Sequence, residues 1–207
     1  MIGIINYEMG NIRSVEKSLL RIGSSEIKIL SEPSNLKSCT KIILPGVGHF
    51  AQGMKNLIAK DWIKHLEECI IEKKIPILGI CLGMQLLTEY SEEGDVEGLG
   101  FIKGKTQKFN PDIIPRKLSL PQMGWNSILS LKVHPLIHEI SIEDTFYFVH
   151  NYFVTTTFED ETIATTKYGT TYSSIIGKNN ILGVQFHPEK SHNSGLKILK
   201  NFLDIKS

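Results

Sequence analysis

Residues 77–87 read ILGICLGMQLL and place Cys81 between Gly79 and Gly83. An apolar run of strand length that leads directly into a second apolar segment predicts a buried strand turning sharply into a helix at the cysteine. The pentapeptide has the G-x-S-x-G pattern of a nucleophile elbow, with sulfur in place of oxygen. The N–H groups that open such a helix favour a thiolate. By itself, the stretch predicts a nucleophile no more strongly than a small buried side chain at a tight turn.

Strand-like and helix-like segments alternate around this stretch. The strands of the N-terminal half are almost continuously apolar, which is typical of a parallel sheet covered by helices on both faces. We expect strands at 2–6, 27–30, 41–44 and 75–80, and helices at 12–22, 61–73 and 82–90. The first 90 residues therefore predict an α/β sheet with parallel strands.

The sequence changes character after residue 95. Runs such as TFYFVHNYFVTTTF (145–158) are rich in β-branched and aromatic residues, which predicts a strand-rich, partly antiparallel C-terminal half. A last helix is expected at about 194–205 because its apolar residues recur with helical spacing. No repeat or linker divides the chain. The prediction is a single α/β domain over residues 1–207, with a mixed, mostly parallel central sheet flanked by helices.

The bulk composition argues against several classes of function. The formal charge is +1 and Lys and Arg do not cluster, so nucleic-acid binding is not favoured. No apolar run approaches the roughly 20 residues of a membrane-spanning helix, and the start MIGIINY lacks the basic region of a signal peptide. Three scattered cysteines form no disulfide framework. We expect a soluble protein of a reducing cytoplasm that contacts neither nucleic acid nor membrane.

Neither a metal site nor a cofactor is expected. His134 and His138 flank Pro135, which spoils a two-ligand helical face, and no C-x-x-C accompanies them. Residues 46–51 (GVGHFA) fit the dinucleotide-binding pattern G-x-G-x-x-A after a strand. Pro45 precedes them, however, and the region about 20 residues further on reads as helix rather than as a strand ending in an acid. A loop that offers backbone N–H groups to an oxyanion fits these glycines better.

A thiol nucleophile needs a base, and His187 is the strongest candidate among seven histidines. It follows the strand-like run 181–186 and begins His187-Pro188-Glu189. Pro188 favours an extended His187, and residues two apart in an extended segment project to the same side. Glu189 can therefore reach the imidazole and orient it. The pattern predicts a triad of nucleophile, base and orienter in the order Cys81, His187, Glu189.

Several motifs together resemble a known family. GICLGMQ, GVQFHPEKS and LPGVG resemble the corresponding motifs of the class I glutamine amidotransferases. This resemblance implies a flavodoxin-like fold and the same Cys–His–Glu triad. Further motifs in the family's order, among them NYEMGNIRSVEKSL, MGWN and FYFVH, are most similar to the branch formed by glutaminase subunits of imidazole glycerol phosphate synthase.

The resemblance also implies roles for residues around the triad. The implied substrate contacts are Gly46, Gln85 and Glu93. The implied oxyanion hole is formed by the backbone of Leu82 with that of Val47 or Gly48. In this family the loop that carries the last two residues must rearrange, prompted by the partner subunit, before hydrolysis becomes fast.

The implied reaction is hydrolysis of L-glutamine to glutamate and ammonia, without a cofactor. The ammonia passes to a cyclase subunit of (β/α)8 fold, with which the chain forms a heterodimer. That cyclase makes imidazole glycerol phosphate and AICAR, products that belong to histidine and purine biosynthesis.

Three positions depart from the pattern of this branch. Gln122 stands where histidine is usual, Glu8 where glycine is usual, and Asn6 where aspartate is common. None belongs to the triad, but several lie in segments that face the synthase in this family. They leave open an alternative acceptor of the ammonia, a sugar-amidating synthase of surface-polysaccharide biosynthesis that a paralogous glutaminase supplies.

Overall fold

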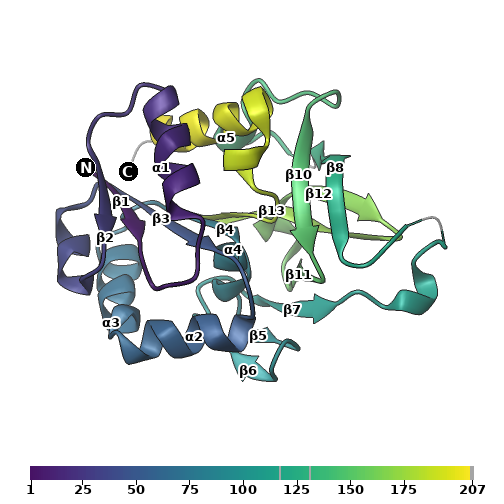
Figure 1. Cartoon of the computed structure of the whole chain (residues 1–207), viewed down its shortest axis with the longest axis horizontal. Coiled ribbons are helices and arrows are strands. Elements are labelled where there is room, and N and C mark those ends of the chain that lie inside the picture. Colours follow the sequence, from purple (N-terminus) through teal and green to yellow (C-terminus); the bar gives the residue numbers. More distant parts are fainter. Residues whose placement is uncertain (117, 131, 206–207) are drawn as a thin grey trace.

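A large mixed sheet crosses the molecule, with helices on both of its faces (Figure 1). The computed structural model describes residues 1–116, 118–130 and 132–205. Helices α1 (Ile12–Arg21) and α5 (His192–Asp204) cover one face, and α2 (Phe50–Ala59) and α3 (Trp62–Leu66) cover the other. The predicted α/β fold with a mixed central sheet is confirmed.

The parallel part of the sheet combines the N-terminal strands with the last strand of the chain. Its strands lie in the order β2 (Ile27–Leu30), β1 (Ile2–Ile5), β3 (Lys41–Gly46), β4 (Ile77–Cys81) and β14 (Ile181–Val184). Gly46 pairs with Cys81, and Ile80 pairs with Val184, so three neighbouring strands end at nearly the same level. The segments that follow them meet at one edge of the sheet, where parallel sheets commonly bind ligands.

The C-terminal half extends the sheet mainly by antiparallel hairpins. Beyond β14 lie β13 (Thr170–Lys178), β11 (Tyr152–Thr156), β7 (Gly104–Lys108), β5 (Tyr90–Ser91) and β6 (Val96–Glu97), while β12 (Thr162–Tyr168) joins β13, and β9 (Leu129–Ser130) joins β12. Strands β8 (Gln122–Ser127) and β10 (Thr145–His150) form a separate antiparallel pair. In the described part of the chain, these two strands pair only with each other.

Buried side chains alternate along the central strands and form one apolar cluster on each face of the sheet. In β3, Ile43 belongs to the cluster that contains Val15 of α1 and Phe202 of α5. Its neighbours Ile42 and Leu44 belong to the other cluster, which packs against α2 and α3. Both faces of the parallel strands are therefore apolar, which explains their nearly continuous hydrophobic sequence.

Helix α4 (Leu82–Leu86) is shorter than predicted, because the expected helix runs to residue 90. The N–H groups of Leu99 and Ile102 donate to the carbonyls of Leu86 and Leu87 at 2.8 and 3.0 Å. These tertiary hydrogen bonds replace the helical bonds that a further turn needs, so the chain leaves the helix.

The predicted helix over 61–73 consists of two parts. After α3 the chain continues as a π-helix, η2 (Glu67–Glu72), and Asp61 makes no side-chain hydrogen bond to the helix start. Asp61, which directly precedes α3, adopts a left-handed backbone with φ 56°. Short 3-10 helices occupy Pro33–Ser38, Pro111–Ile113, Pro135–Ile137, Glu159–Glu161 and Pro188–Lys190.

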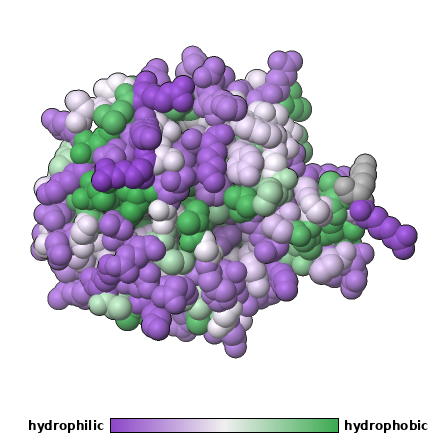
Figure 2. Space-filling view, in the orientation of Figure 1, coloured by the Kyte–Doolittle hydropathy of each residue, from purple (hydrophilic) through white to green (hydrophobic). Residues whose placement is uncertain are grey.

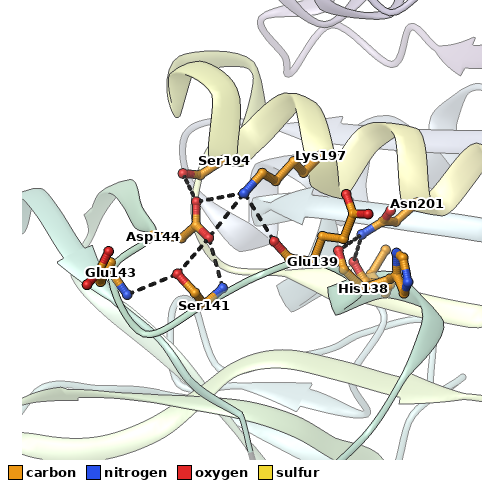
Figure 3. A network of polar contacts seen from close by, with 9 residues as sticks. His138, Glu139, Ser141, Glu143, Asp144, Ser194, Lys197 and Asn201 are labelled. Carbon is orange, nitrogen blue, oxygen red and sulfur yellow. Dashed lines mark hydrogen bonds and ion pairs between the residues drawn. The ribbon is translucent and has the colours of Figure 1, made fainter.

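A polar network fastens the segment before β10 to α5 (Figure 3). Asp144 accepts hydrogen bonds from the hydroxyl of Ser194 at 2.6 Å and from the backbone N–H of Ser141 at 2.8 Å. Lys197 lies 3.4 Å from the same carboxylate. Further along the helix, Asn201 donates to the carbonyl of His138 at 2.7 Å. The first turns of α5 are thereby held firmly in place.

The surface is largely polar. On the face seen in Figure 2, hydrophobic residues form a broken band across the middle, surrounded by hydrophilic residues. Among residues 1–116, 118–130 and 132–205, no helix combines the length and the apolar character needed to cross a membrane.

Candidate active site

Cys81 ends β4 and immediately precedes α4, so the sharp strand-to-helix turn is present. Its backbone has φ 54° and ψ −109°, a left-handed conformation that residues other than glycine rarely adopt. Such a conformation costs on the order of 1–3 kcal/mol and is concentrated at functional sites. The side chain is only 6% exposed but borders a cavity. The thiol is thus held at the edge of the sheet by a strained backbone.

The two glycines that flank Cys81 permit a close approach of backbones. A Cβ atom on Gly83 would overlap the carbonyl oxygen of Leu44 in β3, and one on Gly79 would lie 2.6 Å from the carbonyl oxygen of Gly83. Neither obstacle is a flexible side chain. Helix α4 can therefore begin directly against β3 and β4 only because both positions lack a side chain.

Gly83→Ala is expected to lower the free energy of unfolding by about 3 kcal/mol, since overpacking against rigid backbone lies at the upper end of its usual cost. Chemical denaturation followed by circular dichroism measures this change. Gly53→Ala is the matched control, because its new methyl group meets only the side chains of Leu86 and Leu82 at 3.3 Å or more. Equal stability of the two variants would contradict the close approach at Gly83.

The imidazole of His187 lies against the carboxylate of Glu189. Nδ1 and Oε1 are 2.9 Å apart, and the two side chains are 1% and 2% exposed. The predicted contact is present, but the 3-10 turn Pro188–Lys190 makes it, rather than an extended strand. The other ring nitrogen, Nε2, is buried and has no hydrogen-bond partner among the described residues. Nε2 is therefore the atom that can exchange a proton with the sulfur or with a substrate.

The charges around His187 favour its protonated form. Burial by itself lowers the pKa of His187, but the neighbouring Cys81 and Glu189 outweigh burial and raise the pKa to about 10. His150 borders the same cavity, and burial lowers its pKa to about 4. At neutral pH the first imidazole carries a proton to donate, whereas the second is uncharged.

A glutamine amide also reaches the sulfur. Nε2 of Gln185 lies 3.8 Å from Sγ of Cys81, and Oε1 of Gln185 accepts a hydrogen bond from the side chain of Gln85 at 3.1 Å. The carbonyl of Val149 lies 4.0 Å from the same sulfur. Gln185 is not among the residues predicted for the site, although a glutamine within the apolar run ILGVQF, two residues before His187, is a signal that points to it.

The residues predicted for the oxyanion hole lie around the sulfur. Leu82 opens α4, so its N–H has no acceptor within the helix. The N–H of Val47 is donated to the carbonyl of Met9 at 3.1 Å, and it is therefore not free to bind an oxyanion in this conformation. Gly48 has φ 108°, which favours glycine, and lines the cavity beside Val47. The N–H of Leu82 is left without a helical acceptor, whereas the N–H of Val47 is engaged by Met9.

A cavity of about 360 Å³ opens beside the triad. Among the residues with predicted roles, its walls include Val47, Gly48, Cys81, Leu82, Gln85, Glu93 and His187. Further walls come from Pro121 and from residues 149–152, for which the sequence predicted no role. Residues that are more than 100 positions apart in the chain thus surround one space.

The predicted substrate contacts differ in how they meet this cavity. Gln85 is buried and donates to the carbonyl of Tyr152 at 3.0 Å. Glu93 is half-buried and accepts the N–H of Phe50 at 2.7 Å, which joins its loop to the start of α2. Gly46 is buried in β3 and does not line the cavity, but its lack of a side chain leaves room for Gly83, whose N atom would lie 2.7 Å from a Cβ.

A search of protein-family models matches residues 4–205 to the family "Glutamine amidotransferase class-I". The match covers nearly the whole chain, from β1 to the end of α5.

Curated relatives resemble the chain over its full length. An imidazole glycerol phosphate synthase subunit HisH of Sulfurimonas denitrificans is 45% identical over 208 residues, which cover 100% of this chain and 99% of the relative. The subunit named HisH 2 of Methanococcus maripaludis is 44% identical over 203 residues, or 98% of each chain. The HisH subunit of Leptospira interrogans is 40% identical over 205 residues, covering 99% of this chain and all of the relative.

Solved structures share the fold at much lower sequence identity. A crystal structure described as a glutamine amidotransferase superposes with a TM-score of 0.75 at 16% identity, covering 98% of this chain and 97% of the other. PurLQS of Thermotoga maritima superposes with a TM-score of 0.74 at 17% identity and the same coverage. The family match, the full-length relatives and the shared fold agree, and the chain belongs to the class I glutamine amidotransferase family.

Proposed function

We propose that this protein is the glutaminase subunit of an imidazole glycerol phosphate synthase, and that it hydrolyses L-glutamine to glutamate and ammonia. The observation that carries the proposal is the meeting of Cys81 and His187 at one cavity, at the carboxyl edge of the parallel strands, with Glu189 against the imidazole. The relatives that bear the name of that synthase are 40–45% identical over nearly the whole chain.

The first half of the reaction transfers the glutamyl group to sulfur. The thiolate of Cys81 attacks the side-chain amide carbon, and the negative charge that develops on oxygen faces the N–H of Leu82. The C–N bond then breaks, and Nε2 of His187 donates its proton to the departing nitrogen, which leaves as ammonia. The raised pKa of His187 suits this step, because Cys81 and Glu189 keep the ring protonated at neutral pH.

The second half of the reaction hydrolyses the thioester and regenerates the free thiolate of Cys81. The neutral imidazole of His187 takes a proton from a water molecule, whose oxygen attacks the glutamyl thioester. The C–S bond breaks, glutamate is released, and Cys81 and His187 regain their starting protonation. Glu189 holds Nδ1 throughout, so that Nε2 remains the atom that faces the reaction.

The loop at Val47 supports a role for a partner in activation. Its N–H is committed to Met9, so the second oxyanion donor becomes available only when that hydrogen bond breaks. The resemblance to the family implies such a rearrangement on binding of the synthase. We expect the free chain to hydrolyse glutamine slowly for this reason.

The separate strand pair β8–β10 offers a docking surface beside the cavity. Trp125 and Met123 on β8 are 48% and 60% exposed, and Pro121, just before this strand, lines the cavity itself. Exposed aromatic side chains are frequent anchors of protein interfaces. Trp125 is also held in place, because its ring stacks on His192 with centroids 4.9 Å apart. We propose that a cyclase of (β/α)8 fold covers this surface and forms a heterodimer.

The acceptor that we propose belongs to histidine biosynthesis. The sugar-amidating alternative is not favoured, since the relatives carry the name of the imidazole glycerol phosphate synthase subunit. Of the three departures from the pattern, Gln122 accepts a hydrogen bond from Tyr172 at 2.9 Å and Glu8 pairs with Lys60 at 2.6 Å. A cytoplasmic location stays a prediction.

Glutamate release from glutamine, measured with and without the cyclase subunit encoded in the same genome and its nucleotide ligand, tests the function. We expect the complex to be about 10- to 100-fold faster than the free chain, a coupling of about 1–3 kcal/mol. Absence of hydrolysis in both samples would overturn the glutaminase assignment. Fast hydrolysis by the free chain, unchanged by the cyclase, would instead point to a stand-alone hydrolase.

A further inference from the structure

The hydroxyl group of Ser191 has an unusual set of partners for its position. Ser191 is the N-cap residue of α5, and a serine there usually accepts a hydrogen bond from an N–H of the first helical turn. In this structure Ser191 makes no such bond. Its side chain is buried, with the residue 1% exposed, and turns away from the helix that it could stabilise.

The hydroxyl instead joins the backbone of His187 to that of β10. It donates to the carbonyl of His187 at 2.6 Å and accepts the N–H of Tyr147 at 2.9 Å. The carbonyl of Tyr147 in turn accepts the N–H of His187 at 2.9 Å. The three residues therefore close a ring of three hydrogen bonds, in which both backbone polar groups of His187 are held.

This ring matters because His187 lies outside regular secondary structure. Strand β14 ends at Val184, and its contact with β13 continues only to Gln185, whose N–H is donated to the carbonyl of Ser174 at 2.9 Å. His187 itself lies beyond this pairing, just before the 3-10 helix that begins at Pro188. The direction of the imidazole depends on that backbone, because its Cα–Cβ bond starts from it. A small rotation would separate Nδ1 from Glu189 and change the direction in which Nε2 points.

The neighbouring helix does not need the Ser191 hydroxyl for its own placement. Gly195 in the first turn of α5 packs so tightly on Pro188 that a Cβ would overlap the Pro188 carbonyl oxygen. The carboxylate of Asp144 holds Ser194 and Lys197 of the same helix (Figure 3). The bonds of Ser191 therefore add little to the attachment of α5, and they act on His187.

We propose that Ser191 is a positioning residue, whose hydroxyl fixes the backbone of His187 so that the imidazole stays between Cys81 and Glu189. The assignment of a benefit to catalysis rests on the proposed glutaminase function. Ser191 does not line the cavity, so it has no part in holding glutamine.

Ser191→Ala in the full chain, assayed for glutamine hydrolysis with the cyclase subunit present, tests the proposal. We expect kcat to fall about 10- to 100-fold, since a displacement of about 1 Å costs as much, while KM changes less than about twofold. Ser194→Ala is the matched control: it removes a hydroxyl of the same helix, whose partner is Asp144. The control is expected to melt at a lower temperature with kcat unchanged. Ser191→Thr keeps the hydroxyl and is expected to exceed Ser191→Ala in kcat.

A second readout does not depend on turnover. Alkylation of Cys81 by iodoacetamide, followed by mass spectrometry of its peptide in the free chain, reports how well His187 supports the thiolate. We expect Ser191→Ala to slow this alkylation several-fold and Ser194→Ala to leave it unchanged, with the buried Cys39 and Cys69 as internal references.

Ser191→Ala with wild-type kcat and a wild-type alkylation rate would overturn the proposal, whether or not its melting temperature falls. Equal kcat values for Ser191→Thr and Ser191→Ala would contradict the role of the hydroxyl. If the wild-type complex hydrolyses no glutamine, the proposed function fails, and the alkylation rates still decide the positioning role.

Discussion

Cys81→Ser is expected to reduce glutamine hydrolysis by the complex on the order of 10³- to 10⁶-fold, the loss that follows removal of a nucleophile from a triad. The oxygen of serine is a far weaker nucleophile at neutral pH than a thiolate. The variant also lacks the Cys81 charge, which helps to raise the pKa of His187 in the wild type.

The substitution should spare the fold and the docking surface. Serine is smaller than cysteine, it meets the same backbone at φ 54°, and β8 lies on another part of the chain. Co-purification with the cyclase and a thermal melt check both points. Cys39→Ser serves as the control, since Cys39 is buried elsewhere and its sulfur donates to the carbonyl of Asn35 at 3.7 Å. Hydrolysis by Cys81→Ser within tenfold of the wild-type rate would contradict the role of Cys81 as the nucleophile.

Glu189→Gln is expected to lower kcat by about 10²- to 10⁴-fold with the protein folded, as replacement of the acidic member does in other triads. The amide has the shape of the carboxylate but no charge. Because the carboxylate raises the pKa of His187, its loss moves that pKa down from about 10. The imidazole then gives up its proton at a lower pH, and the neutral amide holds Nδ1 more weakly than the charged carboxylate does.

A pH titration of the His187 ring by nuclear magnetic resonance, in the wild type and in Glu189→Gln, measures the shift directly. Cys81 remains in the variant and also raises the pKa of His187. That pKa is therefore expected to lie below the wild-type value but above the value of a buried histidine without charged neighbours. Glu16→Gln, which removes a surface ion pair with Arg13 at 2.8 Å, is the control and should change neither value. Identical titration curves for wild type and Glu189→Gln would refute the pairing.

The parts of the candidate site that the sequence predicts are contacts between residues close together in the chain. The elbow at Cys81 and the pair His187–Glu189 depend on residues within two positions of each other, so spacing and glycine placement are enough to predict them. The edge of the sheet at which they meet follows from the parallel strand pattern. The roles assigned to these residues remain predictions, and the experiments above are their test.

The contacts that the sequence does not predict join segments that are distant in the chain. The hydrogen bond from Val47 to Met9 links two loops, and nothing in either loop's composition requires it. The early end of α4 is set by residues 99–102, which follow it by more than ten positions. Propensity predicts a helix beyond Leu86, and tertiary hydrogen bonds override it.

The backbone conformation at position 8 explains why glycine is usual there in the family. Glu8 adopts φ 69°, a region in which glycine is at ease and glutamate is strained. This accounts for the usual glycine at that position. The sequence alone shows that glutamate replaces glycine, and the structure shows that this glutamate has a strained backbone.

Among the described residues, strands β8 and β10 form a two-stranded sheet of their own and do not pair with the large sheet. Its outward side chains, Trp125 among them, can be exchanged without removing a hydrogen bond of the parallel strands that carry Cys81. With the docking surface proposed above, substitutions on β8 can alter which synthase is recognised while the residues of the glutamine chemistry stay unchanged. One amide-hydrolysing scaffold can in this way be redeployed among several biosynthetic acceptors.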